Sequence, residues 1–122
     1  MTEDDARVPD ETDLLRRVHP EQVIWDENVG VLRPTSAAFR DVEMSVNLGD
    51  DIEREGLTSE FAVRNHPRHH LAALTALAAR AEEQDVRRTP RADDPTHGDV
   101  VGAKPKPRRT VFALGARWEI LR

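Results

Sequence analysis

Histidine is the residue type whose spacing in this 122-residue sequence most suggests chemistry. Three of the five histidines lie within residues 65–70, and His97 follows an Asp-Pro-Thr turn sequence. His66 and His70 are four residues apart, which places two imidazoles on one helical face, and His97 and Asp99 could complete the ligands of one divalent metal ion. However, Pro67 lies between the pair and is tolerated only in a first helical turn. The alternative is that these are polar, solvated histidines at a helix start.

Acid–base catalysis by a histidine is the second chemistry that the residue types allow. It needs an imidazole that a carboxylate holds close to a nucleophile. The candidates are His19, Ser36, Asp41 and His97. Cysteine is absent, as are the G-x-S-x-G turn, the P-loop and the G-x-G-x-x-G turn, which excludes thiol catalysis and the common phosphate-binding loops. A small His-dependent hydrolase, nuclease or transferase, with or without a metal ion, is therefore an alternative function.

Basic residues gather in the segment 87–109. Seven positive charges lie there: Arg87, Arg88, Arg91, Lys104, Lys106, Arg108 and Arg109. Such a segment could neutralise phosphates, and nucleic-acid binding through it is a further alternative function. Three aspartates dilute the charge, and no aromatic residue between positions 62 and 111 is available for base stacking. A solvated basic loop at 104–109 is the simpler interpretation.

The elements that must position these residues form one α+β domain over residues 14–122, with short and mainly antiparallel strands. The first 15 residues hold six acidic side chains against one arginine, so we expect residues 1–13 to be an acidic, disordered tail. Strands are predicted at 14–18 and 43–48, the second with Met44, Val46 and Leu48 on one face. Turn residues 26–30 predict a hairpin between 23–25 and 31–32.

The second half of the chain predicts helices. Two short helices are expected at 50–55, ended by Gly56, and at 58–63. The most regular apolar periodicity predicts one longer helix at about 69–84, for which a buried strand at 71–77 is the rival. A strand is expected at 99–102, and the segment 109–121 is either a strand pair or a helix followed by a strand.

One pattern resembles a family of small bacterial proteins. It consists of Arg17-Val18-His19-Pro20, then Ser36-Ala37-Ala38-Phe39, then Ser45-Val46, with Asp94-Pro95-Thr96-His97-Gly98 following later. The resemblance covers residues 14–122. It implies a small bacterial α+β domain and no particular activity.

Composition narrows the function further. No stretch approaches the roughly 18 apolar residues of a membrane span, and residues 1–5 lack the basic start of a signal peptide, so we expect a cytoplasmic protein without a membrane partner. We predict an accessory or protein-interaction module without its own catalysis or cofactor, acting with a partner protein or as a homo-oligomer. The residues expected at the interface are Trp25, Phe39, Arg108, Arg109 and Trp118.

Overall fold

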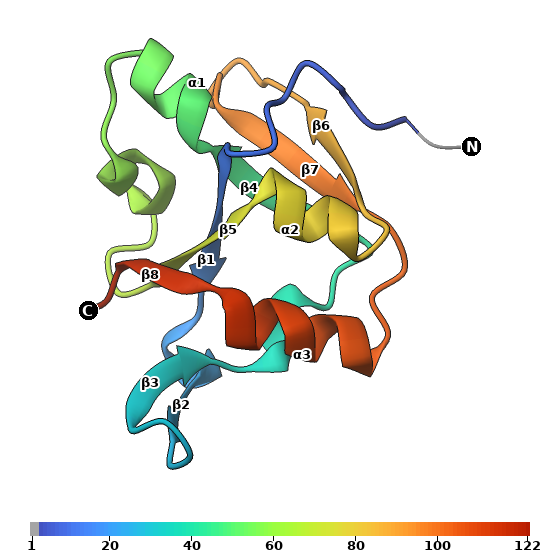
Figure 1. Cartoon of the computed structure of the whole chain (residues 1–122). Coiled ribbons are helices and arrows are strands. Elements are labelled where there is room, and N and C mark those ends of the chain that lie inside the picture. Colours follow the sequence, from blue (N-terminus) through green and yellow to red (C-terminus); the bar gives the residue numbers. More distant parts are fainter. Residues whose placement is uncertain (1–2) are drawn as a thin grey trace.

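The computed structural model describes residues 3–122 and shows a six-stranded antiparallel sheet with helices packed on it (Figure 1). The strand order is β6-β7-β4-β1-β5-β8. The strands are β1 (Asp13–Val18), β4 (Glu43–Leu48), β5 (His70–Thr75), β6 (Asp85–Arg88), β7 (His97–Val101) and β8 (Arg117–Ile120). A separate hairpin, β2 (Val23–Asp26) and β3 (Val31–Pro34), projects from one end of the molecule.

Three α-helices and three 3-10 turns connect these strands. They are α1 (Gly49–Arg54), α2 (Ala76–Ala81), α3 (Lys106–Gly115), η1 (Pro20–Gln22), η2 (Ser36–Phe39) and η3 (Ser59–Val63). Within residues 3–122, none of the helices combines the length and the apolar character that crossing a bilayer requires. The mixture of antiparallel strands and helices confirms the predicted α+β class.

Side-chain alternation along the strands builds two apolar layers of unequal extent. Leu14 points into the larger layer, where α2, α3 and η2 pack on the sheet. Leu15, the next residue, points to the opposite face, where α1 and η3 cover a smaller layer. This second layer does not extend over β4 and β7, where the same face carries polar side chains: Ser45, Asn47, His97 and Asp99. The sheet therefore leaves a polar area for a site on this face.

Several predicted elements are confirmed. The strands at 14–18 and 43–48 and the hairpin are present, and Met44, Val46 and Leu48 are all buried. Helix α1 ends before Gly56, whose φ of 69° is the left-handed conformation that favours glycine. At the C-terminal end, α3 followed by β8 selects the helix-and-strand alternative.

The predicted long helix at 69–84 is wrong over its first half, and the rival strand is correct there. Residues 70–74 are all buried, because β5 lies between β1 and β8 and is covered on both faces. A strand covered on both faces has a continuous apolar run, which also satisfies the spacing of a helix. Helix α2 begins only at Ala76, where the Thr75 hydroxyl accepts a hydrogen bond from the Ala78 amide at 3.1 Å.

Two further elements differ from the sequence prediction. The predicted loop at 104–109 is partly helical, because α3 begins at Lys106 and Pro107 occupies its first turn, where proline loses no helical hydrogen bond. Strand β6 follows the predicted helix in a segment for which no element is predicted, and it pairs with β7 along its length. Its short length and two arginines hide the strand pattern in the sequence.

The acidic N-terminal segment packs on the domain from Glu3 onward, whereas its composition predicts disorder over residues 1–13. Val8 is fully buried in the larger layer, and the Asp5 amide donates to the Val86 carbonyl at 2.8 Å. Arg80 of α2 donates to Asp4, to Asp10 and to two carbonyls of this segment. Composition gives no sign of these contacts, since the arginine that pairs with the acidic residues lies about 70 residues away in sequence. Residues 1 and 2 lie outside the described residues.

Lys104 is a buried cation at the end of β7. Its ammonium donates to the carbonyls of Val42, Val100 and Gly102 at 3.0, 2.9 and 3.2 Å. Burial disfavours the charged form and lowers the pKa of Lys104 to about 8. The side chain thus fastens the chain before β4 to the chain after β7, and its charge state depends on folding.

We expect the free energy of unfolding to rise between pH 8 and pH 10.5, because the unfolded chain keeps a proton on Lys104 that the folded chain has released. Lowering the pKa from 10.5 to about 8 corresponds to a rise of at most about 3 kcal/mol. Urea unfolding at a series of pH values measures it, and the absence of tyrosine and cysteine leaves few other groups that titrate here. Lys104→Met should lose the rise, and the exposed control Lys106→Met should keep it; equal pH dependence in both variants would contradict the assignment.

Candidate functional site

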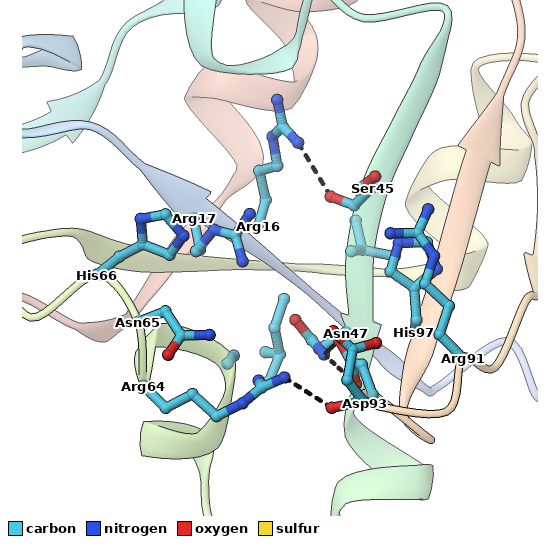
Figure 2. A pocket seen from close by; sticks show the side chains of 14 residues that line it. Arg16, Arg17, Ser45, Asn47, Arg64, Asn65, His66, Arg91, Asp93 and His97 are labelled. Carbon is cyan, nitrogen blue, oxygen red and sulfur yellow. Dashed lines mark hydrogen bonds between the residues drawn. The ribbon is translucent and has the colours of Figure 1, made fainter.

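The sheet splits between β1 and β4. The two strands pair only at Leu14–Leu48 and Leu15–Asn47. Beyond these pairs the Arg16 side chain spans the gap, where its guanidinium donates to the Ser45 carbonyl at 3.0 Å (Figure 2). The same guanidinium donates to the Ala38 carbonyl of η2 at 3.0 Å and pairs with Asp41. A side chain thus satisfies the Ser45 carbonyl, which does not pair with β1.

A small polar hollow lies at this split, and we call it the split pocket. It is lined by β1, β4 and His97 of β7 and by the segments 62–66 and 91–94 (Figure 2). Its volume is about 160 Å³. That equals roughly five water molecules and is below the roughly 300–1,000 Å³ of pockets for drug-sized ligands. The split pocket therefore fits a small polar group rather than a whole organic ligand.

An amide–carboxylate network fixes the 91–97 loop beside the split pocket. The Asn47 side-chain amide donates to Asp94 at 2.9 Å and to the Thr96 hydroxyl at 2.7 Å. Asp94 also accepts from the Thr96 amide and hydroxyl, and the Thr96 carbonyl accepts from the Leu48 amide. Asn47 and Thr96 are buried, so these bonds are shielded from water and hold the loop firmly.

Three arginines without an ion-pair partner among residues 3–122 line the split pocket together with two aspartates, Asp93 and Asp94, so these five side chains leave an excess of positive charge. Arg64 lies over the Phe61 ring and donates to the Phe61 carbonyl, and it also donates to the Asp93 carbonyl (Figure 2). Arg17 and Arg91 have no side-chain hydrogen bond within residues 3–122. None of the three pairs with a carboxylate in the described part of the chain. Ten of the sixteen arginines do form such pairs: 7, 16, 33, 54, 80, 87, 88, 108, 117 and 122. Three of the six remaining arginines therefore line one small hollow.

The pKa values of Arg17 and His66 reflect the same excess of positive charge. Partial burial, followed by the neighbouring charges of Arg16 and Arg64, lowers the pKa of Arg17, and Asp94 opposes this only weakly. Desolvation, followed by the charge of Arg17, also lowers the pKa of His66 at the edge of the pocket. Arg17, Arg64 and His66 are therefore close enough for their positive charges to disfavour one another. An anion bound beside them would stabilise the charged form of each side chain.

His97 lines the split pocket and has one ring nitrogen without a hydrogen-bond partner. The residue is 5% exposed, and its Nε2 is buried without a partner among the described residues. Its Nδ1 lies 2.8 Å from the Thr89 hydroxyl and 3.2 Å from the Thr89 carbonyl. The hydroxyl can donate to Nδ1 or accept from it, whereas the carbonyl can only accept. The tautomer decides which of these bonds forms, and with it whether Nε2 is a donor or an acceptor.

The structure does not bring the predicted metal ligands together. His97 is directed to Thr89, His70 accepts from the Arg122 amide at 3.0 Å and lies against Trp118, and Asp99 lies further along β7. The ring of His66 lies 4.8 Å from that of His69 instead. Across residues 3–122, no group of three or more histidine or acidic side chains has the geometry to hold a metal ion. The i, i+4 argument fails because His66 precedes β5 and does not lie in a helix with His70.

The four catalytic candidates are also dispersed. His19 caps η1 through its Nδ1, Ser36 lies in η2, and Asp41 pairs with Arg16 on the far side of the split. Of the four, only His97 lines the split pocket. The structure therefore shows no histidine–carboxylate–hydroxyl arrangement among these residues.

The predicted interface residues have different environments. Trp25 is 59% exposed on the β2–β3 hairpin, beside further exposed apolar residues of the same hairpin. Phe39 is completely buried against Phe112, so its assignment to an interface is wrong and its role is in the core. Trp118 is half-buried and donates to the Leu32 carbonyl, fastening the hairpin to β8.

The two predicted interface arginines pack beside α3. Arg108 pairs with Glu83 at 2.6 Å and donates to the Ala103 carbonyl at 3.1 Å. Arg109 is half-buried, and its Nε has no partner in the described residues. These surroundings do not show whether Arg108 and Arg109 contact a partner protein, so their place at an interface stays a prediction.

Sequence reasoning named Arg91, His66 and His97 for separate functions and missed Arg17, Asn47 and Arg64. These residues come from separate segments, and only folding places them together. One signal was available: alternation puts Asn47 and Ser45 on the polar face of β4, which indicates that this face lacks an apolar cover.

We expect neutral His97 to carry its proton on Nε2, with the Thr89 hydroxyl donating to Nδ1 across the shorter of the two contacts. Nitrogen chemical shifts of the imidazole in the labelled protein measure the tautomer directly. Thr89→Val keeps the side-chain shape and removes the donor, so the proton should move to Nδ1 and donate to the Thr89 carbonyl. A wild-type ring protonated on Nδ1 would refute the assignment.

Comparison with known proteins finds no relative: no family model, no curated protein and no solved structure matches the chain. The function must therefore be argued from the geometry of the split pocket.

Proposed function

We propose that this chain is a small cytoplasmic binding module, without catalysis of its own, whose split pocket binds a phosphate-type anionic group. The observation that supports this most directly is the convergence of Arg17, Arg64 and Arg91 on one hollow, none of them paired with a carboxylate of residues 3–122. Guanidinium groups bind phosphate through paired, charge-assisted hydrogen bonds. The chain as a whole carries a net charge of −5, so this positive hollow contrasts with the rest of the molecule.

The remaining features of the split pocket agree with such a ligand. A volume of about 160 Å³ accommodates one tetrahedral oxyanion with a few waters. His97 lines the same hollow, and the Asn47–Asp94–Thr96 network engages the Asp94 oxygens, so that this carboxylate forms no direct ion pair with an arginine among residues 3–122. An anion in the split pocket would thus contact cationic groups that form no ion pair within residues 3–122, which favours binding.

Nucleic-acid binding through residues 87–109 has weaker support. Arg87 pairs with Glu3, Arg88 with Asp50 and Asp51, and the Lys104 ammonium is buried. These charges therefore do not form one continuous basic surface of the kind that backbone phosphates need. We also expect the chain to bind a partner protein or a second copy of itself, and the exposed apolar residues of the β2–β3 hairpin would suit such a contact.

Inorganic phosphate should bind in the split pocket, and Arg17→Gln should weaken it by about tenfold or more, since a hydrogen bond between charged groups contributes roughly 1.5–3 kcal/mol. Nitrogen–proton NMR titration of the labelled protein measures the dissociation constant and locates the shifts. The matched control is Arg40→Gln, which removes the same charge from an exposed arginine that does not line the split pocket. Equal weakening in both variants, or shifts spread evenly over the surface, would refute the proposal.

Sulfate should bind more tightly as the pH falls from 7 to 5.5, because His66 gains a proton beside the anion while sulfate keeps its charge. The pKa of His66 is held low by desolvation and then by Arg17, and a bound anion offsets the latter. His69, Arg64 and Asp93 also lie near this segment, so the His66→Gln variant isolates the His66 contribution. Sulfate titrations of both proteins at several pH values measure the effect; the same pH dependence without His66 would contradict its role.

A further inference from the structure

A second hollow adjoins the split pocket on the other side of residues 65–66, and we call it the imidazole pocket. It is lined by His19, Pro20 and residues 65–70, together with Glu21 and Arg122. Its volume is about 780 Å³, within the range of pockets that take an organic ligand. Flat rings and proline surfaces dominate this lining, in contrast to the charged lining of the split pocket.

The two pockets are adjacent and share part of their lining. Asn65 and His66 line both of them. The charge of Arg17, in the split pocket, also contributes to lowering the pKa of His69 in the imidazole pocket, after desolvation and the neighbouring imidazoles. A single ligand can therefore place a charged group at Arg17 and a larger group against the histidines.

The histidines of the imidazole pocket form a string of neighbouring rings. The rings of His66 and His69 lie 4.8 Å apart, and those of His69 and His19 lie 5.2 Å apart, both in edge-to-face arrangements. Burial and the neighbouring charges lower the pKa of His66 and His69, so both rings are largely neutral at pH 7. Neutral imidazoles and the exposed guanidinium of Arg68 offer flat surfaces on which a heteroaromatic ring stacks.

We propose that the ligand is a nucleoside 5′-monophosphate unit, with its phosphate in the split pocket and its base stacked on the His19–His69–His66 string. This inference rests on the proposed function, since it assigns the phosphate to the same arginines. The unit could be a free nucleotide or the 5′ end of a nucleic-acid strand, because both present the same phosphate, sugar and base.

The test compares inorganic phosphate, ribose 5-phosphate and adenosine 5′-monophosphate as ligands of the full chain, by calorimetry and NMR titration. Adenosine 5′-monophosphate should bind at least about fivefold more tightly than ribose 5-phosphate, which corresponds to the lower end of measured base-stacking contributions. Its addition should shift the signals of His19 and His69, whereas inorganic phosphate should shift mainly those around Arg17.

Variants separate this inference from the proposed function. His69→Ala should remove the advantage of adenosine 5′-monophosphate over ribose 5-phosphate and leave the affinity for inorganic phosphate unchanged, whereas Arg17→Gln should weaken all three ligands. His19→Ala, at an exposed position, repeats the first test with a second variant. Equal affinity for the two sugar phosphates, with phosphate binding intact, would overturn this inference alone. Absence of phosphate binding would overturn the proposed function.

Oligonucleotides distinguish the two sources of the ligand. A 5′-phosphorylated single strand that binds as tightly as the free nucleotide identifies a strand end, and a strand that binds far more weakly identifies the free nucleotide. A strand with a 5′ hydroxyl should not compete with inorganic phosphate. Competition by that strand would overturn the proposal, because the terminal phosphate would then be unnecessary.

Discussion

The separation of β1 from β4 is the constraint on which the rest of this structure depends. Two strands in the middle of a sheet that stop pairing expose backbone carbonyls, and leaving them unpaired would cost roughly 1–3 kcal/mol each. Arg16 offsets this cost by donating to the Ser45 carbonyl of β4, and its other nitrogens bind the Ala38 carbonyl of η2 and Asp41. Because a side chain rather than a strand fills the gap, the sheet remains intact around an opening. That opening is the split pocket, where Arg17, the next residue, lies on the opposite face.

The distribution of helices explains why this opening remains polar. Helices α2 and α3 cover the larger apolar layer, whereas α1 and η3 are short and cover the second face only near β1 and β5. The acidic N-terminal segment, which could otherwise neutralise the pocket, is held by Arg80 at α2. Its carboxylates therefore do not line the split pocket. The protein keeps a negative net charge overall and a positive hollow at one place, an arrangement that directs small anions to that place.

Sequence patterns predicted the parts of this fold that depend on local chemistry. The alternation of Met44, Val46 and Leu48 identified β4, and the turn residues identified the hairpin. The prediction failed where tertiary contacts decide. The run Leu71–Leu74 fits a helix and a doubly covered strand equally well, and only its position between β1 and β8 makes it a strand. The site could not be predicted for the same reason: Arg17 and Arg91 are 74 positions apart in sequence, and their common lack of a carboxylate partner is a property of the folded chain.

Asp94 shows how a protein can keep cations unpaired beside an acid. Its carboxylate lies near Arg17, and a direct ion pair between them would neutralise the split pocket. Instead, its oxygens accept hydrogen bonds from the Asn47 side-chain amide and from the Thr96 amide and hydroxyl. These neutral donors occupy the oxygens of Asp94, which keeps its negative charge, and leave the Arg17 guanidinium without a direct ion pair among residues 3–122. Since Thr96 is followed directly by His97, the Asp-Pro-Thr-His turn both engages the Asp94 oxygens and places His97 in the pocket lining. One short segment therefore sets both the charge and the hydrogen-bonding capacity of the pocket.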